Sequence, residues 1–420
     1  MKIAVVGAGI SGLVAAHHLH PEHDITVYEA NDYVGGHTST HRVDLADETH
    51  WVDTGFIVYN DRNYPNFEPL LAELGVETQP SHMSFSVSDD AGSFEYASTP
   101  RGLFAQRSHL ADRRFLRMVR DLVRFNREAP SLLELAPGEG PSLREFLHEG
   151  GYSDWFVQRL IVPQASAVWS ADPGQMWSFP ATFLARFFAN HGMLGFRDRP
   201  QWRTVTGGSH RYVEKIVQPF DDRIRLSAPV REIRRDHDSV SVTADGCETE
   251  RFDEVVIAAH SDQALAMLAD PSDRERELLG SIPYQRNEAV LHTDRSLLPR
   301  RRAAWASWNC HLLGEEPDRT ALTYWMNNLQ RLPTETPICV TLNRTEAIDP
   351  EKVIAKVDYS HPVFTPDGVA AQARHGEISG VNRTHYCGAW WGWGFHEDGV
   401  VSALRALENV GHASSLAEAA

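Results

Sequence analysis

A glycine motif near the N-terminus constrains the fold more than any other feature of the chain. The motif spans residues 7–12, follows a buried-strand pattern at residues 3–6 and precedes a helical pattern at residues 13–19. A second strand pattern, at residues 25–28, ends at Glu29. Strand, glycine turn, helix, strand and acid in this order are typical of a βαβ unit that binds a dinucleotide. The sequence therefore predicts an α/β fold whose N-terminal part is Rossmann-like.

Each position of the motif has a physical reason. Gly7 permits the tight turn, Gly9 lets the backbone approach a pyrophosphate, and Gly12 lets helix and strand pack closely. The helix begins near Ser11, where free amide groups can donate hydrogen bonds to phosphates. Glu29 can accept hydrogen bonds from ribose hydroxyls. These residues are thus predicted to bind a dinucleotide.

Further glycine-rich and hydrophobic segments follow along the chain in a fixed order. They are a glycine pair before His37, a D-x-G segment at residues 53–55, the segments 206–209, 228–233 and 252–259, and a closing pair at 386–389 and 399–403. With these segments the sequence resembles the flavin amine oxidase superfamily over nearly its whole length. That superfamily includes monoamine and polyamine oxidases, protoporphyrinogen oxidase, phytoene-desaturase-like enzymes and polyunsaturated fatty acid isomerases.

The resemblance implies a fold and a cofactor. The fold is α/β, with a Rossmann-like FAD-binding domain of the amine-oxidase (GR2) type and an inserted α+β substrate-binding domain. The FAD-binding domain would take residues 1–75, 200–275 and 376–420, and the substrate-binding domain residues 76–199 and 276–375. FAD is expected to bind noncovalently. The predicted cofactor-binding residues are Gly7, Gly9, Ser11, Gly12, Glu29, Ala30, Gly36, His37, Thr38, Thr54, Gly55, Phe56, Val230, Gly388, Ala389, Asp398, Gly399 and Val400.

Two segments resemble a narrower group. Residues 162–170 and 392–399 are similar to a bacterial "predicted NAD/FAD-binding" branch of the superfamily. Relatives of this branch often accompany cyclopropane-fatty-acid-synthase-like methyltransferases. The resemblance therefore implies an apolar or lipid substrate, with a lipid methyltransferase as a candidate partner.

The sequence departs from the amine oxidases at the positions that serve amine chemistry. Many amine oxidases carry a lysine near the flavin, but the corresponding segment here, residues 287–294, contains none. His37 stands where those enzymes commonly have arginine. No cysteine occupies the position of a covalent flavin link, and Cys387 is interpreted as a small buried hydrophobic residue. Hydride transfer to flavin is still expected, because the cofactor carries that chemistry.

Candidate catalytic residues lie in three segments. His396 is a candidate proton carrier because its ordinary pKa is close to neutrality. Glu397 is a further candidate, although either it or Asp398 could instead cap the last helix. Tyr59 follows the D-x-G segment and could face the substrate. His292 lies on the strand that lacks lysine, as a replacement for that lysine or as a structural histidine.

Two segments of the middle region have alternative interpretations. Residues 179–196 place aromatic side chains on one helical face, which fits either a core helix or the wall of an apolar tunnel. Residues 113–127 form an Arg-rich amphipathic pattern. This pattern fits either a solvated helix face or a peripheral contact with an anionic membrane.

Composition excludes several functions. The 420 residues include 40 Lys+Arg and 57 Asp+Glu, which gives a net charge of −17 and disfavours nucleic-acid binding. The four cysteines are widely spaced, and no metal-ligand pattern occurs, so no metal is expected. No segment reaches the ~18 apolar residues of a membrane span. We expect a cytoplasmic protein, with a peripheral position at the inner membrane face as an alternative.

The sequence thus favours an FAD-dependent oxidoreductase that abstracts a hydride from an apolar substrate, a fatty acyl or modified lipid chain. It would act as a dehydrogenase or desaturase, or as a double-bond isomerase. One alternative is a flavin amine oxidase that acts on a primary or secondary amine. The other is a noncatalytic FAD-binding partner of a lipid methyltransferase.

Overall fold

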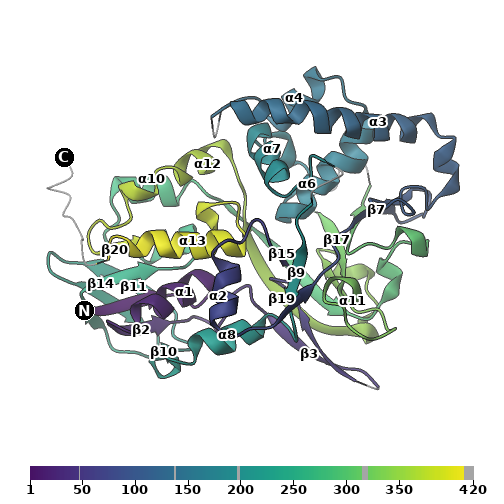
Figure 1. The fold of residues 1–420 in the computed structure, drawn as a ribbon. Coiled ribbons are helices and arrows are strands. Elements are labelled where there is room, and N and C mark those ends of the chain that lie inside the picture. The colour runs from purple at the N-terminus through teal and green to yellow at the C-terminus, as the bar shows by residue number, and fades with distance from the viewer. Residues whose placement is uncertain (47, 137–138, 196–198, 315–319, 411–420) are drawn as a thin grey trace.

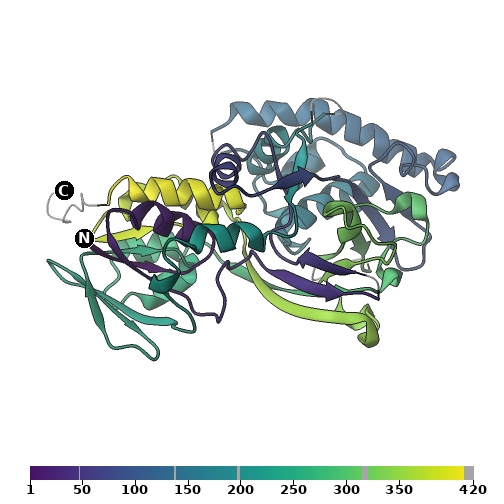
Figure 2. The ribbon, with the colours of Figure 1, turned by 60° about the horizontal axis from the view of Figure 1, so that its bottom comes forward.

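The fold is described from a computed structural model. It describes residues 1–46, 48–136, 139–195, 199–314 and 320–410. The end of the predicted FAD-binding domain, residues 411–420, and the end of the aromatic segment, residue 196, lie outside the described residues. Two lobes lie side by side, and the N-terminus is in the lobe that contains α13 (Figures 1 and 2).

A five-stranded parallel sheet forms the centre of the first lobe. Its strand order is β10 (Ile224–Arg225), β2 (Asp24–Tyr28), β1 (Lys2–Val6), β14 (Glu254–Ile257) and β20 (Thr384–Tyr386). The predicted strands at residues 3–6 and 25–28 are therefore confirmed, as is a Rossmann-like α/β architecture. The carboxyl ends of these strands meet at one edge, where ligands bind in such sheets.

Successive side chains of β1 point to opposite faces of this sheet, and because those from Ile3 to Val6 are all apolar, both faces must be covered. Ile3 and Val5 pack against helices, whereas Ala4 and Val6 pack on the opposite side. The helical side contains α1 (Ile10–Leu19), α8 (His210–Val217) and α13 (His396–Leu407). The other side is covered by an antiparallel meander of β11 (Val230–Arg235), β12 (Val240–Ala244) and β13 (Glu250–Phe252).

A mixed seven-stranded sheet forms the centre of the second lobe. Its order is β19 (Val353–Pro362), β15 (Tyr284–His292), β18 (Cys339–Leu342), β17 (Ala321–Trp325), β16 (Trp308–Leu312), β7 (Phe85–Asp89) and β8 (Glu95–Ala97). All neighbours are antiparallel except β16 and β7.

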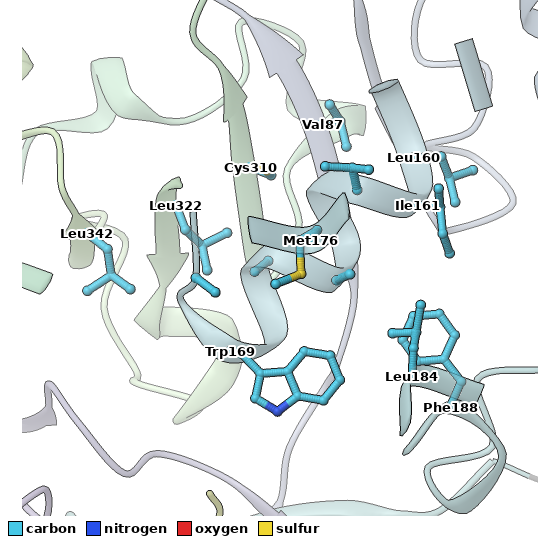
Figure 3. Close-up of a cluster of buried hydrophobic side chains, with 14 of the residues drawn as sticks. Val87, Leu160, Ile161, Trp169, Met176, Leu184, Phe188, Cys310, Leu322 and Leu342 are labelled. Carbon is cyan, nitrogen blue, oxygen red and sulfur yellow. The ribbon is translucent and has the colours of Figure 1, made fainter. Parts of the chain in front are cut away.

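Helices pack on one face of this second sheet. They are α3 (Arg113–Glu128), α4 (Leu143–Glu149), α5 (Asp154–Phe156), α6 (Val162–Trp169) and α7 (Ala181–Asn190), with a π-turn between α5 and α6. Figure 3 shows the shared core, in which Trp169 and Met176 from the helical layer approach Leu322 and Leu342 of the sheet. An inserted α+β arrangement is thus observed.

Shorter elements complete the described chain. They are the hairpin β3 (Thr40–Asp44) and β4 (Thr49–Asp53), the small sheet β5 (Tyr59–Asn60), β9 (Trp202–Val205) and β6 (Thr78–Pro80), and the helices α2 (Phe67–Glu73), α9 (Ser261–Met267), α10 (Asp273–Leu279), α11 (Met326–Leu329) and α12 (Pro366–Gln372). Within the described residues, no helix is both long enough and apolar enough to cross a bilayer.

Candidate cofactor and substrate cavity

A cavity of about 870 Å³ runs from the carboxyl edge of the parallel sheet to the second lobe. Its volume is typical of a site for a cofactor or large ligand. Most of the residues predicted to bind cofactor line it: Gly7, Gly9, Ser11, Glu29, Ala30, Gly36, His37, Thr54, Gly55, Phe56, Val230, Gly388 and Ala389. The candidate proton carrier His396 lines it too.

The glycine loop between β1 and α1 shapes one end of the cavity. Gly7 adopts a positive φ of 102°, which a residue with a side chain rarely adopts. A Cβ on Gly12 would lie 1.8 Å from the carbonyl oxygen of Gly7, so Gly12 lies behind the loop and off the lining. A Cβ on Gly9 would meet no atom within 4 Å. Gly9 therefore leaves open space in front of the α1 N-terminus, where phosphates bind.

Glu29, at the end of β2, holds this loop in place. Its Oε2 accepts a hydrogen bond of 2.8 Å from the backbone N–H of Ala8. Its Oε1 accepts from the backbone and side-chain nitrogens of Asn31, both at 2.9 Å. A carboxylate has further acceptor sites, so the carboxylate can still accept a ribose hydroxyl, as the sequence predicts.

The glycine pair brings a second loop against the first. The backbone N–H of Gly35 donates to Ala8 O at 2.8 Å, and a Cβ on Gly36 would lie 3.1 Å from Gly9 Cα. His37 follows directly, and its ring stacks on Tyr359 with the centroids 5.0 Å apart. Burial, with a smaller effect of His260, lowers the pKa of His37 to about 4. The ring is therefore neutral at neutral pH in the cavity described here.

One part of the cavity, which lies between α6, the second sheet and the segment before α13 and is called the inner end below, is aromatic and apolar. Its lining includes Trp169, Trp308, Tyr324, Leu342, Phe364 and Trp393. Trp169 Nε1 donates to the carbonyl oxygen of Trp393 at 3.1 Å, which joins α6 to the segment before α13. The phenyl groups of Phe183 and Phe187 on α7 lie off the lining, behind this wall. The aromatic face of α7 is therefore a core face that supports the cavity wall.

His396, the first residue of α13, lies where the cavity meets the first lobe. Its ring stacks on Phe56 at 3.6 Å, and its Nε2 lies 3.0 Å from both Thr38 Oγ1 and Tyr212 Oη. Burial, with a smaller effect of His37, lowers the pKa of His396 well below its ordinary value. This shift disfavours the protonated form of the ring. Its role as proton carrier stays a prediction.

The two acids after His396 hold backbone groups. Asp398 accepts a hydrogen bond of 2.9 Å from the N–H of Phe395, which caps α13. Glu397 accepts from the N–H of Asn66 at 3.1 Å, from its Nδ2 at 2.6 Å and from the N–H of Phe67 at 2.9 Å. These contacts cap α2, and Glu397 lies off the cavity lining.

We expect Glu397→Ala to destabilise the protein. The substitution leaves the amide donors at the start of α2 without acceptors, and we expect a loss of about 1–3 kcal/mol in the free energy of unfolding. Urea denaturation measures it. Glu73→Ala, at the exposed end of the same helix, is the matched control and should change the value by less than about 0.5 kcal/mol. Equal losses in the two variants would contradict the capping role.

Several predicted residues lie near the cavity without lining it. Gly399 and Val400 are buried in the first turn of α13, and the hydroxyl of Thr38 contacts His396 and Tyr212. Tyr59 is 1% exposed and packs edge-on against Tyr64 and Phe67. Tyr59 therefore belongs to the core beside the cavity.

His292 lies inside the seven-stranded sheet. Its Nε2 is 2.7 Å from Thr341 Oγ1, and its Nδ1 accepts from the N–H of Asp294 at 3.0 Å. Both ring nitrogens are thus engaged away from the cavity lining. None of the four lysines and none of the four cysteines lines the cavity.

The structure adds residues that the sequence did not indicate. His260, Tyr284, Tyr359 and His361 line the cavity. The spacing of Tyr359 and His361 along one strand could have signalled a shared face. Nothing in the sequence indicated that this face would meet His37.

Comparison with known proteins identifies the class. The family model for flavin containing amine oxidoreductases matches residues 10–302. The chain therefore belongs to this family, which confirms the resemblance found in the sequence.

Three relatives illustrate the range of the family. AofH of Mycobacterium tuberculosis H37Rv, a flavin-containing monoamine oxidase by name, is 25% identical over 323 residues, which cover 73% of this chain and 65% of AofH. Cyclohexylamine oxidase from Brevibacterium oxydans has a TM-score of 0.69 at 18% identity, over 98% of this chain and 99% of that structure. A CLA-producing fatty acid isomerase from P. acnes has a TM-score of 0.65 at 16% identity, over 97% and 98%. Because the sequence identities to these two solved structures are only 18% and 16%, the structural similarity shows a shared fold and nothing more specific.

FAD is the cofactor of this family, and the residues present fit it. Gly9 leaves the space in front of α1 open, and Glu29 lies at the ribose position of a βαβ unit. The absence of cysteine from the lining fits noncovalent binding. FAD would thus be held by the glycine loop, by Glu29 and by the loop that carries Gly36.

Proposed function

We propose that the protein is an FAD-dependent oxidoreductase that removes a hydride from a C–H bond of an apolar substrate, a fatty acyl or modified lipid chain. The observation that carries the proposal is the aromatic inner end of the cavity, which lacks lysine. The carboxylates on the lining belong to Glu29, which holds the glycine loop, and to Asp358, which accepts two hydrogen bonds from Arg286. The inner end therefore offers apolar surface to a substrate.

Bound FAD would supply a two-electron acceptor for the hydride. Loss of a proton from the neighbouring carbon would leave a double bond, and the electrons would pass on to dioxygen, a quinone or a protein. Return of the hydride at another carbon would instead move an existing double bond without net oxidation. Trp169, Phe364 and Trp393 line the cavity and would exclude water, and His396, which stacks on Phe56, would accept the proton.

Amine oxidation is the second candidate. Aromatic faces can bind an ammonium group, and both AofH and cyclohexylamine oxidase are named for amines. The chain spans about 65% of the length of AofH. The lack of a lysine at the cavity weighs against this candidate.

Anaerobic titration of the yellow holoprotein tests the proposal. Unsaturated or methyl-branched acyl lipids should bleach the oxidised flavin band, whereas primary and secondary amines should leave it unchanged. Phe364→Ala, which opens the inner end, should slow bleaching by lipid about tenfold or more, because orientation of the reacting carbon is lost. Phe146→Ala, in the core away from the lining, is the matched control.

Bleaching by amines alone would contradict the proposal and favour the second candidate. If neither the panel of lipids nor the panel of amines bleaches the flavin band, product analysis should find a moved double bond in the lipid. If none forms, a substrate outside the two panels and a noncatalytic role as partner of a lipid methyltransferase remain, and only the second predicts a stable complex with that enzyme.

We further propose that α3 places the protein on an anionic membrane surface. Arg113, Arg120 and Arg127 are exposed, and they alternate with Leu116 and Val123, which are 44% and 52% exposed. The helix lies along the outside of the second lobe (Figure 1). The arginines of such a face are attracted to anionic lipids, and its apolar side chains can insert between them. The net charge of the whole chain, −17, would by itself repel an anionic membrane.

Vesicle cosedimentation tests the membrane contact. Basic side chains near an anionic surface contribute about 1 kcal/mol each. Replacement of Arg113, Arg120 and Arg127 by Gln should thus weaken binding to phosphatidylglycerol vesicles about 100-fold. Neutral phosphatidylcholine vesicles should bind neither protein. The exposed arginines Arg101, Arg276 and Arg295, replaced together, are the control, and an equal loss there would contradict a role specific to α3.

A further inference from the structure

Two asparagines connect the backbone of the second sheet to a histidine of the cavity. The backbone N–H of Glu288 donates to Asn343 Oδ1 at 3.0 Å. Asn343 Nδ2 lies 3.1 Å from the carbonyl oxygen of Thr320 and 2.7 Å from Asn287 Oδ1. A peptide N–H can only donate and a carbonyl can only accept. The orientation of the Asn343 amide is therefore fixed from both sides.

The orientation of Asn287 follows from that of Asn343. Because Asn287 Oδ1 accepts, its Nδ2 must be the atom that lies 2.8 Å from His361 Nδ1. Nδ2 also lies 3.4 Å from the carbonyl oxygen of Gln285, which can only accept. Asn287 thus donates to His361 Nδ1, and this nitrogen must keep its lone pair. The proton of the neutral ring is then on Nε2.

The surroundings keep this ring neutral. Burial, with a smaller effect of His37, lowers the pKa of His361 to about 3. A proton on Nδ1 would also face the N–H groups of Asn287.

Other groups around His361 offer no counter-charge. His37, on the neighbouring loop, has its ring centroid 5.4 Å away. Tyr359 lies on the same strand, and its hydroxyl oxygen is 2.9 Å from Thr54 Oγ1. His260, before α9, stacks on Tyr284 of β15 at 4.5 Å.

The carboxylates of the two flanking strands are engaged elsewhere. Asp358 pairs with Arg286, and Glu288 accepts from the hydroxyl of Thr345. Among the described residues no group of three or more potential ligands is placed to hold a metal ion.

We propose that Asn343 and Asn287 fix His361 in the tautomer that carries its proton on Nε2, and that this N–H donates to an oxygen of bound FAD. His361 lines the cavity and would contact the cofactor, whereas the two asparagines are positioning residues. The acceptor is a phosphate oxygen or a flavin carbonyl oxygen. The inference depends on FAD as cofactor and not on the substrate proposed above.

Asn343→Asp is the decisive variant because it touches neither His361 nor the cavity. Aspartate tolerates the positive φ of 56° at this position. Its carboxylate accepts from Glu288 and cannot donate to Asn287. The Asn287 amide should therefore rotate and turn its oxygen to His361, and the ring proton should move to Nδ1. Nε2 would then repel an oxygen acceptor, so the dissociation constant of FAD should rise roughly tenfold or more.

Long-range proton–nitrogen NMR of protein labelled at its histidine nitrogens reads the tautomer directly, with His361→Gln to assign the signal. Wild type should show an unprotonated Nδ1, and Asn343→Asp should show a protonated one. Asn327→Asp is the matched control. Asn327 also bridges backbone groups, at Thr334, Thr336 and Ile338, and its replacement should leave both the tautomer and FAD binding unchanged.

Asn287→Asp gives an independent test through pH. An aspartate would stabilise the imidazolium and raise the pKa of His361. FAD should then bind tightly at low pH and more weakly as pH rises through the new pKa, because the neutral ring would keep its proton on Nδ1. The wild-type affinity should not change with the titration of His361 between about pH 5 and 8, a range that lies above the pKa of His361.

Cofactor fragments distinguish the two acceptors. A phosphate acceptor predicts that Asn343→Asp weakens the binding of ADP, and a flavin acceptor predicts weaker binding of riboflavin. A protonated Nδ1 in the wild-type protein would overturn the proposal. A changed tautomer with unchanged binding of FAD, ADP and riboflavin would overturn the contact with the cofactor. If Asn343→Asp does not fold, the wild-type spectrum and Asn287→Asp still decide.

Discussion

Gly9→Val should yield a folded protein that no longer binds FAD. A Cβ at Gly9 would meet no atom within 4 Å, so a side chain at this position begins in open space. It would occupy the space in front of α1, where the backbone must approach the pyrophosphate. We expect the dissociation constant of FAD to rise at least about 100-fold, which corresponds to about 2.7 kcal/mol. Flavin fluorescence on dilution measures it, and urea denaturation without FAD should differ little from wild type.

Gly12→Ala should behave differently although Gly12 belongs to the same glycine motif. Its Cβ would lie 1.8 Å from Gly7 O, a backbone atom that cannot move without the loop. We therefore expect a loss of about 1–3 kcal/mol in the free energy of unfolding without FAD, together with weaker binding. Gly376→Ala is the control, because its Cβ also meets open space. If Gly9→Val and Gly12→Ala had the same effect on unfolding without FAD, the assigned geometry of the loop would be wrong.

Arg235→Met should cause the largest loss of stability, about 3–5 kcal/mol, because it leaves a buried carboxylate without its partner. The Arg235 and Glu275 side chains are 2% and 4% exposed and form two hydrogen bonds of 2.8 and 3.0 Å. Arg235 also donates to Asp270, and Tyr386 donates to Glu275. Thermal or urea unfolding gives the value. Addition of Glu275→Gln should recover part of the loss, since it removes the unpaired charge and keeps an acceptor.

The loss of stability caused by Arg235→Met should depend on pH in a defined direction. Burial raises the pKa of Glu275, but the hydrogen bonds and charge of Arg235 outweigh it and hold the pKa below its ordinary value. Such a group contributes stability above its unfolded-state pKa of about 4.3. That contribution is lost as pH falls through the depressed pKa of the folded state. The gap between wild type and Arg235→Met should therefore be widest at neutral pH and should shrink in acid. A gap independent of pH would contradict this account.

The sequence predicted the parts of the site that are local in the chain. Strand, glycine loop, helix and acid occupy one βαβ unit, so spacing alone placed Gly7, Gly9 and Glu29. The glycine pair was recognisable for the same reason. The exclusion of lysine from the site could also be predicted, because only four lysines exist.

Long-range pairing limited the rest of the prediction. His37 meets Tyr359 and His361 because β19 pairs with β15, and no spacing indicates this contact. His292 was proposed for its chemistry. Alternation along β15 puts it on the opposite face from Asn287, whose amide contacts His361. The sequence alone does not say which face of β15 points to the cavity, because that depends on how β15 pairs with its neighbouring strands.

The measurement that tests the central claim most directly is a single anaerobic turnover with an acyl lipid, followed by mass spectrometry of the product. The account predicts a chain that has lost two hydrogens, in an amount equal to the reduced flavin. A chain of unchanged mass with a moved double bond and no reduced flavin would assign the isomerase form of the same chemistry. Flavin reduced only by an amine, with an imine or its hydrolysis product, would contradict the account.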